Sequence, residues 1–181
     1  MASTEVAGVI SEPNWNNASG ASRSSPLALV DDTGKATTAT VTWTANSVWE
    51  TPIVDQPGNA RMMKGYLDTG NTTTTTVSVS GLPSSANGYN VYVYADGDNA
   101  GDSHTSAYTI SGTGITTTTI SLIDAPNTNF SGTFTQANNS AGNYVVFTTP
   151  NVSAFTISAT PTASSSSFLR APVNGIQVVP Q

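Results

Sequence analysis

The chain has 181 residues, with five Lys or Arg against eleven Asp or Glu for a formal net charge of -6, and it contains no cysteine. This length is enough for one domain to bury a core without disulfides. The five cations are scattered along the chain, so they form no basic stripe of the kind that nucleic acids and anionic membranes require. Only 9% of the residues are charged, against a typical ~25%, so the abundant Ser and Thr must keep the surface hydrated.

Strand-like alternation recurs along the chain in short runs separated by Gly, Pro, Asn and Asp, and helical periodicity is nearly absent. The run "ATVTWTA" (39–45) places Val41 and Trp43 on one face and threonines on the other, which predicts a half-buried strand with Trp43 in the core. The run "GYNVYVYAD" (88–96) has bulky residues on both faces and predicts a central strand. Further strands are expected near 5–10, 27–30, 63–67, 74–80, 106–111, 115–122, 131–135, 143–148, 152–159 and 173–179.

About a dozen short strands with turn signals between them are typical of an antiparallel β-sandwich or jelly roll. We therefore predict an all-β fold, and a single domain over 1–181 because no shift in composition marks a boundary. No apolar run approaches the roughly 18 residues of a membrane span. The opening "MASTEVAGVI" lacks a basic stretch followed by an apolar one, so it is not expected to be a signal peptide.

Four stretches together resemble β-sandwich modules of large secreted bacterial proteins, some of which are attached to glycoside hydrolases. These stretches are "GVISEPNWNNASG", "DQPGNARMMKGYLDTG", "GLPSSANGYNVYVYADGDN" and "FLRAPVNGIQVVP". The expected shape is also similar to the galactose-binding-like jelly-roll class, which includes many carbohydrate-binding modules. The resemblance implies an extracellular protein that binds glycans, and it assigns no ligand residues.

Two tryptophans stand in loop-like surroundings that suit sugar recognition. Trp15 lies among Pro and Asn in "EPNWNNAS", and Trp49 opens a long irregular segment after "ANSV". The apolar face of a sugar ring can pack on an indole while nearby polar side chains bond its hydroxyls. The alternative is that either ring plugs the end of the sandwich as a lid.

The segment 54–68, "VDQPGNARMMKGYLD", is the most chemically mixed part of the chain. Arginine is rare here, so Arg61 is expected to have a fixed role, either donating a fork of hydrogen bonds to a ligand or pairing with Asp55 to tie the loop. We include four residues of this segment among the candidate ligand-binding residues, namely Asp55, Asn59, Arg61 and Tyr66.

The stretch "YADGDNAGDSHTSAYTI" (94–110) concentrates acids beside the only histidine, His104. Hard Ca²⁺ takes six to eight oxygen ligands, and a tight Gly-containing loop can supply four of them from Asp96, Asp98, Asn99 and Asp102. An EF-hand is excluded because Ala100 and Ala107 occupy its positions five and twelve. The alternative is a hairpin loop whose Asp and Asn side chains cap their own backbone.

Catalysis in this loop is disfavoured. Asp102, Ser103 and His104 are sequence neighbours, whereas a triad needs groups from separate elements and an oxyanion hole. Zinc is disfavoured by the lack of cysteine and of a second histidine.

The sequence therefore predicts a non-catalytic, extracellular carbohydrate-binding module, with Ca²⁺ as a candidate stabilising ion, that targets an attached secreted enzyme to a polysaccharide or oligosaccharide. It is not expected to be an enzyme, and neither nucleic acid nor membrane is an expected partner. The alternative from another class is a structural spacer or adhesion module of a larger cell-surface protein, in which the same loops bind no small ligand.

Overall fold

A computed structural model describes residues 1–70 and 72–181. Its thirteen elements, in chain order, are β1 (Ser22–Val30), β2 (Ala36–Thr44), β3 (Ser47–Glu50), α1 (Asn59–Lys64), β4 (Gly65–Asp68), β5 (Thr75–Ser80), β6 (Tyr89–Tyr94), β7 (His104–Ser111), β8 (Thr118–Asp124), β9 (Ser140–Ala141), β10 (Tyr144–Thr149), β11 (Ala154–Ser164) and β12 (Gly175–Pro180).

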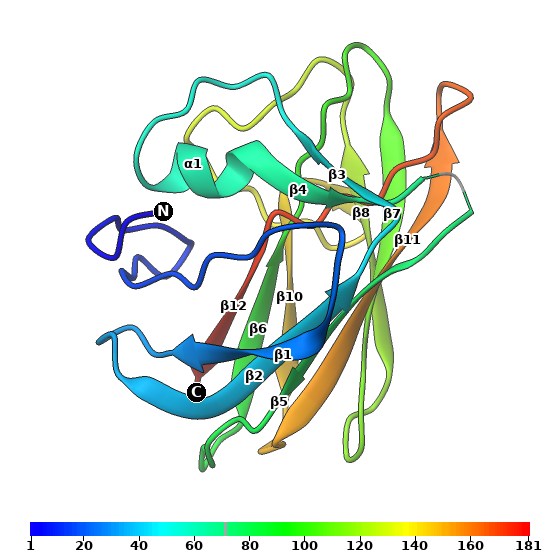
Figure 1. The fold of residues 1–181 in the computed structure, drawn as a ribbon. Coiled ribbons are helices and arrows are strands. Elements are labelled where there is room, and N and C mark those ends of the chain that lie inside the picture. Colours follow the sequence, from blue (N-terminus) through cyan, green and yellow to red (C-terminus); the bar gives the residue numbers. More distant parts are fainter. Residues whose placement is uncertain (71) are drawn as a thin grey trace.

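Two unequal sheets form the body of the molecule, which confirms the predicted all-β, sandwich-like fold. One sheet has the order β1-β2-β5-β11-β7-β8-β9 and the other the order β10-β6-β12. All pairings are antiparallel except the short parallel contact of β8 with β9. The helix α1 and the separate two-stranded sheet β3-β4 lie across one end (Figure 1). The jelly-roll connectivity itself stays a prediction.

The core lies between the two sheets, where alternate residues of each strand point inward. Val91 and Val93 of β6 are fully buried and belong to the same cluster as Ile157 of β11 and Tyr108 of β7. β6 is the middle strand of its sheet, as its sequence predicts. Trp43 also belongs to this core and is 4% exposed, which confirms the prediction made for it.

Hydroxyl groups line up across the strands of the larger sheet. Ser78 and Thr156 are 2.9 Å apart between their hydroxyl oxygens, and Thr109 and Thr119 are 2.8 Å apart. Such cross-strand pairs stabilise a sheet. The abundance of Thr and Ser thus has a structural use on strands as well as a role in hydration.

Two predicted strands are wrong, and in both segments side-chain contacts are found where strand pairing was expected. Residues 5–10 make only a single bridge, Ala7 with Glu12, because neighbouring side chains take their backbone donors and Gly8 has a φ of 99°. Residues 131–135 form no strand. There Phe134 packs against the ring of Tyr94, with 5.2 Å between ring centroids.

Two elements were not expected from the sequence. The six-residue helix α1 takes up the start of the predicted strand 63–67, leaving β4 as the remainder, and buries Met62 and Met63 against the end of the smaller sheet. The four-residue strand β3 pairs with β4. Among the described residues, no helix combines the length and the apolar character that crossing a membrane would take.

Candidate functional site

A groove of about 940 Å³ is lined by residues of β1, β2 and β5 of the larger sheet and of β12, an edge strand of the smaller sheet. Its walls include aliphatic side chains of the edge strands β1 and β12 and of β2, next to β1, namely Leu27 and Leu29 of β1, Val41 of β2, and Ile176 and Val178 of β12. All five are partly exposed. The groove is therefore mainly apolar, and its walls are formed by β-strands.

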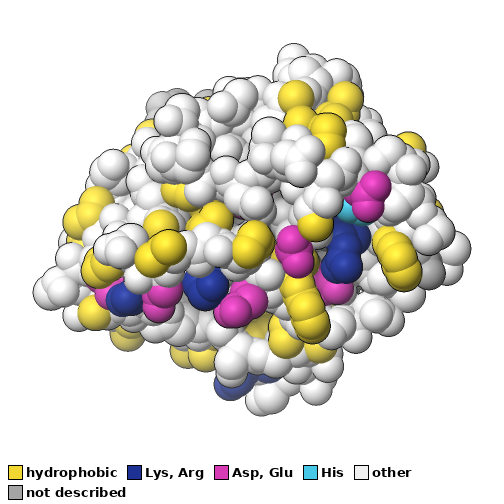
Figure 2. Space-filling view, turned by 90° about the horizontal axis from the view of Figure 1, so that it is seen from above, with side chains coloured by type: hydrophobic (Ala, Val, Ile, Leu, Met, Phe, Trp, Pro, Cys, Tyr) yellow, Lys and Arg dark blue, Asp and Glu magenta, His cyan; other side chains and the backbone are white. Residues whose placement is uncertain are grey.

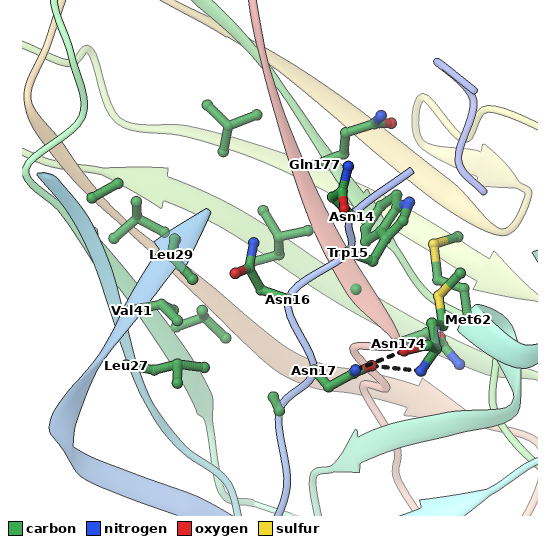
Figure 3. Close-up of a pocket in the computed structure, with 18 of the residues that line it drawn as sticks. Asn14, Trp15, Asn16, Asn17, Leu27, Leu29, Val41, Met62, Asn174 and Gln177 are labelled. Carbon is green, nitrogen blue, oxygen red and sulfur yellow. Dashed lines mark hydrogen bonds between the residues drawn. The ribbon is translucent and has the colours of Figure 1, made fainter. Parts of the chain in front are cut away.

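The N-terminal segment crosses this groove between α1 and the β1 edge (Figures 1 and 3). Its amides fasten it in place: Asn14 donates to the Asp32 carbonyl at 2.6 Å. Asn16 exchanges two 2.9 Å hydrogen bonds with the backbone of Val30. Because these amides are already bonded within the protein, they position the segment and hold the rim of the groove.

Trp15 lies in this segment and lines the groove, but its contacts are those of a packing residue. Its Nε1–H donates to the carbonyls of Glu12 at 2.9 Å and Ala7 at 3.2 Å. Its ring makes an edge contact with Tyr94, with 6.1 Å between centroids. These contacts support the lid alternative for Trp15.

Trp49 also lines the groove and differs in each of these respects. It lies on β3, opposite Tyr66 of β4, and 57% of it is exposed. Within residues 1–70 and 72–181, its indole N–H has no hydrogen-bond partner. Its neighbour Val48 is 44% exposed and lines the same groove. Trp49 thus has both its ring and its donor available to a ligand.

Tyr66 is a buried groove residue beside this tryptophan. It is 4% exposed, and its hydroxyl accepts a 3.2 Å hydrogen bond from the Asp98 backbone N–H. Burial raises the pKa of the Tyr66 hydroxyl to about 12, so this group stays protonated near neutral pH. Tyr66 therefore lines the groove and links β4 to the loop of residues 95–103 between β6 and β7, which we call the acidic loop.

The other residues singled out in segment 54–68 make contacts that tie the loop to the N-terminal segment. Arg61, which lines the groove, donates to Asp55 at 2.8 Å and forms a second ion pair with Glu5. Asn59 accepts a 2.9 Å hydrogen bond from the Gly8 backbone N–H. These contacts support the alternative in which Arg61 and Asp55 tie a long loop.

Ion pairs gather at this end of the molecule. Besides Arg61, the pairs are Lys64 with Glu50 at 3.6 Å and Arg170 with Asp68 at 3.0 Å. Figure 2 shows acidic and basic side chains in a band across this face, with hydrophobic groups beside it. Because most of these charges are paired, the groove mouth presents little net charge to a ligand.

The acidic loop is divided by the structure into two parts. Asp96 and Asn99 are buried, at 3% and 2% exposure, and they meet Asp124 at the end of β8, which is 4% exposed. Asp102 instead accepts a 3.3 Å hydrogen bond from Ser165, and the Asp98 side chain is only partly buried. The sequence could not have indicated Asp124, which lies 22 residues beyond Asp102 on a different strand.

Burial dominates the electrostatics of this cluster. It raises the pKa of the Asp96 and Asp124 carboxyls above the usual range, and the nearby charge of Asp96 raises that of Asp124 further. Within the described residues, neither carboxylate has an ion-pair partner. No group of three or more His, Cys, Asp or Glu that could hold a metal was found there either, so the cluster needs amide oxygens if it is to bind one.

His104 lies at the start of β7 and is 3% exposed. Burial and the positive charge of Arg170 lower its pKa below the ordinary value of 6.5, against opposing contributions from Asp102 and from a hydrogen bond with the Phe168 backbone. A buried neutral imidazole beside an ion pair, with no hydroxyl nucleophile bonded to it among the described contacts, offers no triad geometry.

Comparisons with protein-family models, with curated proteins and with solved structures found no match to this chain.

Proposed function

We propose that the protein is a non-catalytic module that binds a neutral polysaccharide at the groove, with Trp49 as the stacking platform. The observation that carries the proposal is Trp49 itself, which lines the groove while 57% of it stays exposed and its indole N–H is free in the described part of the chain. An exposed indole next to a trough can cover the apolar face of a sugar ring and donate a hydrogen bond to a hydroxyl.

The charge distribution supports an uncharged ligand. The chain carries a net charge of -6, and the cations nearest the groove mouth are held in ion pairs with Asp and Glu. A neutral polyhydroxylated chain can enter without desolvating a charge, whereas an anionic one would be repelled. In the proposed setting the module is part of a secreted protein and keeps an attached enzyme close to its substrate, where modest affinity suffices.

Affinity electrophoresis through gels containing β-glucan, xylan, mannan or galactan tests the proposal. The wild-type protein should be retarded by at least one of them, and Trp49→Ala should weaken binding about tenfold or more, which is ~1.4 kcal/mol. Phe168→Ala is the matched control, because Phe168 is 63% exposed but does not line the groove. If no polysaccharide retards the wild type, the spacer or adhesion alternative is favoured. If both variants bind as the wild type does, the groove is the wrong site.

A further inference from the structure

Two buried carboxylates from different elements converge at the end of the sandwich above Tyr108. Asp96 follows β6 and Asp124 ends β8. The backbone N–H of Gly97, next to Asp96, donates to Asp124 Oδ2 at 3.1 Å. Burying two like charges in one small volume is unfavourable unless something compensates them, and no Lys, Arg or His among the described residues forms an ion pair with either.

Two residues that adjoin this cluster carry buried amide oxygens without hydrogen-bond partners among the described residues. Asn99 is 2% exposed and donates from Nδ2 to Asp124 Oδ1 at 2.8 Å, so its amide touches the cluster. Its Oδ1 is buried and has no hydrogen-bond partner in the described part of the chain. The same holds for Oδ1 of Asn129, the residue before Phe130, whose backbone N–H donates to Asp96 Oδ2 at 3.0 Å. Buried acceptors without a partner are rare and call for an explanation.

Nearby donors do not supply the missing partner. The Tyr108 hydroxyl donates to the Pro172 carbonyl at 2.6 Å, and the Asn174 Nδ2 donates to the Met63 carbonyl at 2.8 Å. The cluster is thus rich in oxygen acceptors and short of positive charge.

We propose that Asp96, Asp124, Asn99 and Asn129 bind one Ca²⁺ ion. Two carboxylates balance the charge of a divalent cation, and carboxylate and amide oxygens are the ligands that hard cations prefer. Ca²⁺ fits better than Mg²⁺ because ligands from two separate segments, the loop after β6 and the end of β8, give an irregular arrangement, which Ca²⁺ tolerates and octahedral Mg²⁺ does not. Water or backbone carbonyls complete the shell of six to eight oxygens. This set keeps Asp96 and Asn99 from the acidic loop and replaces Asp98 and Asp102 by Asp124 and Asn129.

Calorimetric titration and thermal unfolding of the intact chain test this site. The protein is treated with a chelator, dialysed, and titrated with CaCl₂ up to about 10 mM, which covers the weak affinities of extracellular calcium modules. We expect saturable binding of one ion and a rise in melting temperature of roughly 5–10 °C at a hundredfold excess over Kd. MgCl₂ at the same concentration should give a smaller rise.

Asp124→Asn separates a cation site from a merely structural cluster. The variant keeps the shape of the side chain and removes one buried charge, so without metal it should melt at or above the wild-type temperature, and calcium should no longer raise it. Asp98→Asn and Asp102→Asn are matched controls and should keep the wild-type calcium response. A folded wild type that shows neither heat of binding nor a melting shift would overturn the proposal, as would loss of the response in either control. Polysaccharide binding is read separately, so failure here leaves the groove untouched.

Discussion

The hydroxyl of Tyr94 donates a 2.7 Å hydrogen bond to Oε1 of Gln177 and accepts a 2.7 Å hydrogen bond from the backbone N–H of Val9. Gln177 in turn donates from Nε2 to the Ile10 carbonyl at 2.6 Å. Two side chains of the smaller sheet thereby fasten the N-terminal segment without strand pairing. The segment that crosses the groove is thus fixed by buried polar contacts.

We expect Tyr94→Phe to destabilise the protein by about 1–3 kcal/mol, because Tyr94 is fully buried and its loss leaves an acceptor on Gln177 and the N–H of Val9 without a partner. Unfolding in urea gives the free energy. Tyr92→Phe on the same strand is the control, since among the described contacts its hydroxyl makes no hydrogen bond, and it should cost less than ~0.5 kcal/mol. Equal costs would show that the Tyr94 hydroxyl contributes nothing specific.

Substitution of the two groove tryptophans should change the free energy of unfolding in urea by different amounts. Trp15→Ala removes a half-buried ring together with two hydrogen bonds, so we expect a loss of about 2–3 kcal/mol in the free energy of unfolding. Trp49→Ala removes a ring that is 57% exposed and should change stability by less than ~0.5 kcal/mol. If Trp49→Ala proves the more destabilising of the two, the ring packs in a way the structure does not show, and its loss of glycan binding could not be assigned to stacking.

The local alternation of apolar and polar residues predicts a strand correctly where burial of the strand's own side chains determines its structure. The run around Trp43 has one clearly apolar face, the run around Val91 carries bulky residues on both faces, and both strands form where expected. Residues 5–10 have comparable apolar content, yet Asn59 and Tyr94, distant in sequence, bind their backbone donors. Such competition is tertiary, so a local pattern cannot reveal it. The helix α1 escapes detection because six residues are too few for a helical period.

For the candidate sites, too, local sequence identifies some residues, while others depend on tertiary contacts. The loop-like surroundings of Trp15 and Trp49 made both of them candidates, but the sequence could not show that Trp49 lies on β3 and is 57% exposed while Trp15 is held by hydrogen bonds. For the acidic cluster, the antiparallel register of β7 and β8 pairs His104 with Asp124. This register places Asp124 next to the loop that connects β6 and β7. Neither the register nor the length of the connection between these strands can be inferred from the acids themselves.

His104 predicts a pH dependence with a definite sign. Its folded-state pKa is lowered from 6.5 by burial and by Arg170, so below pH 6.5 the unfolded chain binds more protons than the folded one and stability falls as the pH falls. The stability of the wild type relative to His104→Gln should therefore decline from pH 7.5 to pH 5. The difference between the two proteins cancels the contribution of Asp96 and Asp124, which both contain.

A single resonance reports on this group directly, because the chain has one histidine. The imidazole proton signal in the folded protein should titrate with a midpoint below 6.5, and the same signal in urea should titrate near 6.5. A folded-state midpoint at or above 6.5 would contradict the buried, neutral imidazole.

Gly88 and Gly20 form a matched pair that tests the close contact between the Gly88 backbone and the Thr149 carbonyl. Both have positive φ, 84° and 81°, so replacement by Ala costs each about 1 kcal/mol of backbone strain. A Cβ on Gly88 would lie 2.0 Å from the Thr149 carbonyl oxygen, whereas one on Gly20 meets nothing within 4 Å. We expect Gly20→Ala to lose about 1 kcal/mol in urea unfolding and Gly88→Ala to lose at least ~3 kcal/mol or not to fold. Equal losses would mean that the turn before β6 can move away from the end of β10, and that the register which places Tyr94 and Asp96 is less tightly fixed than this contact implies.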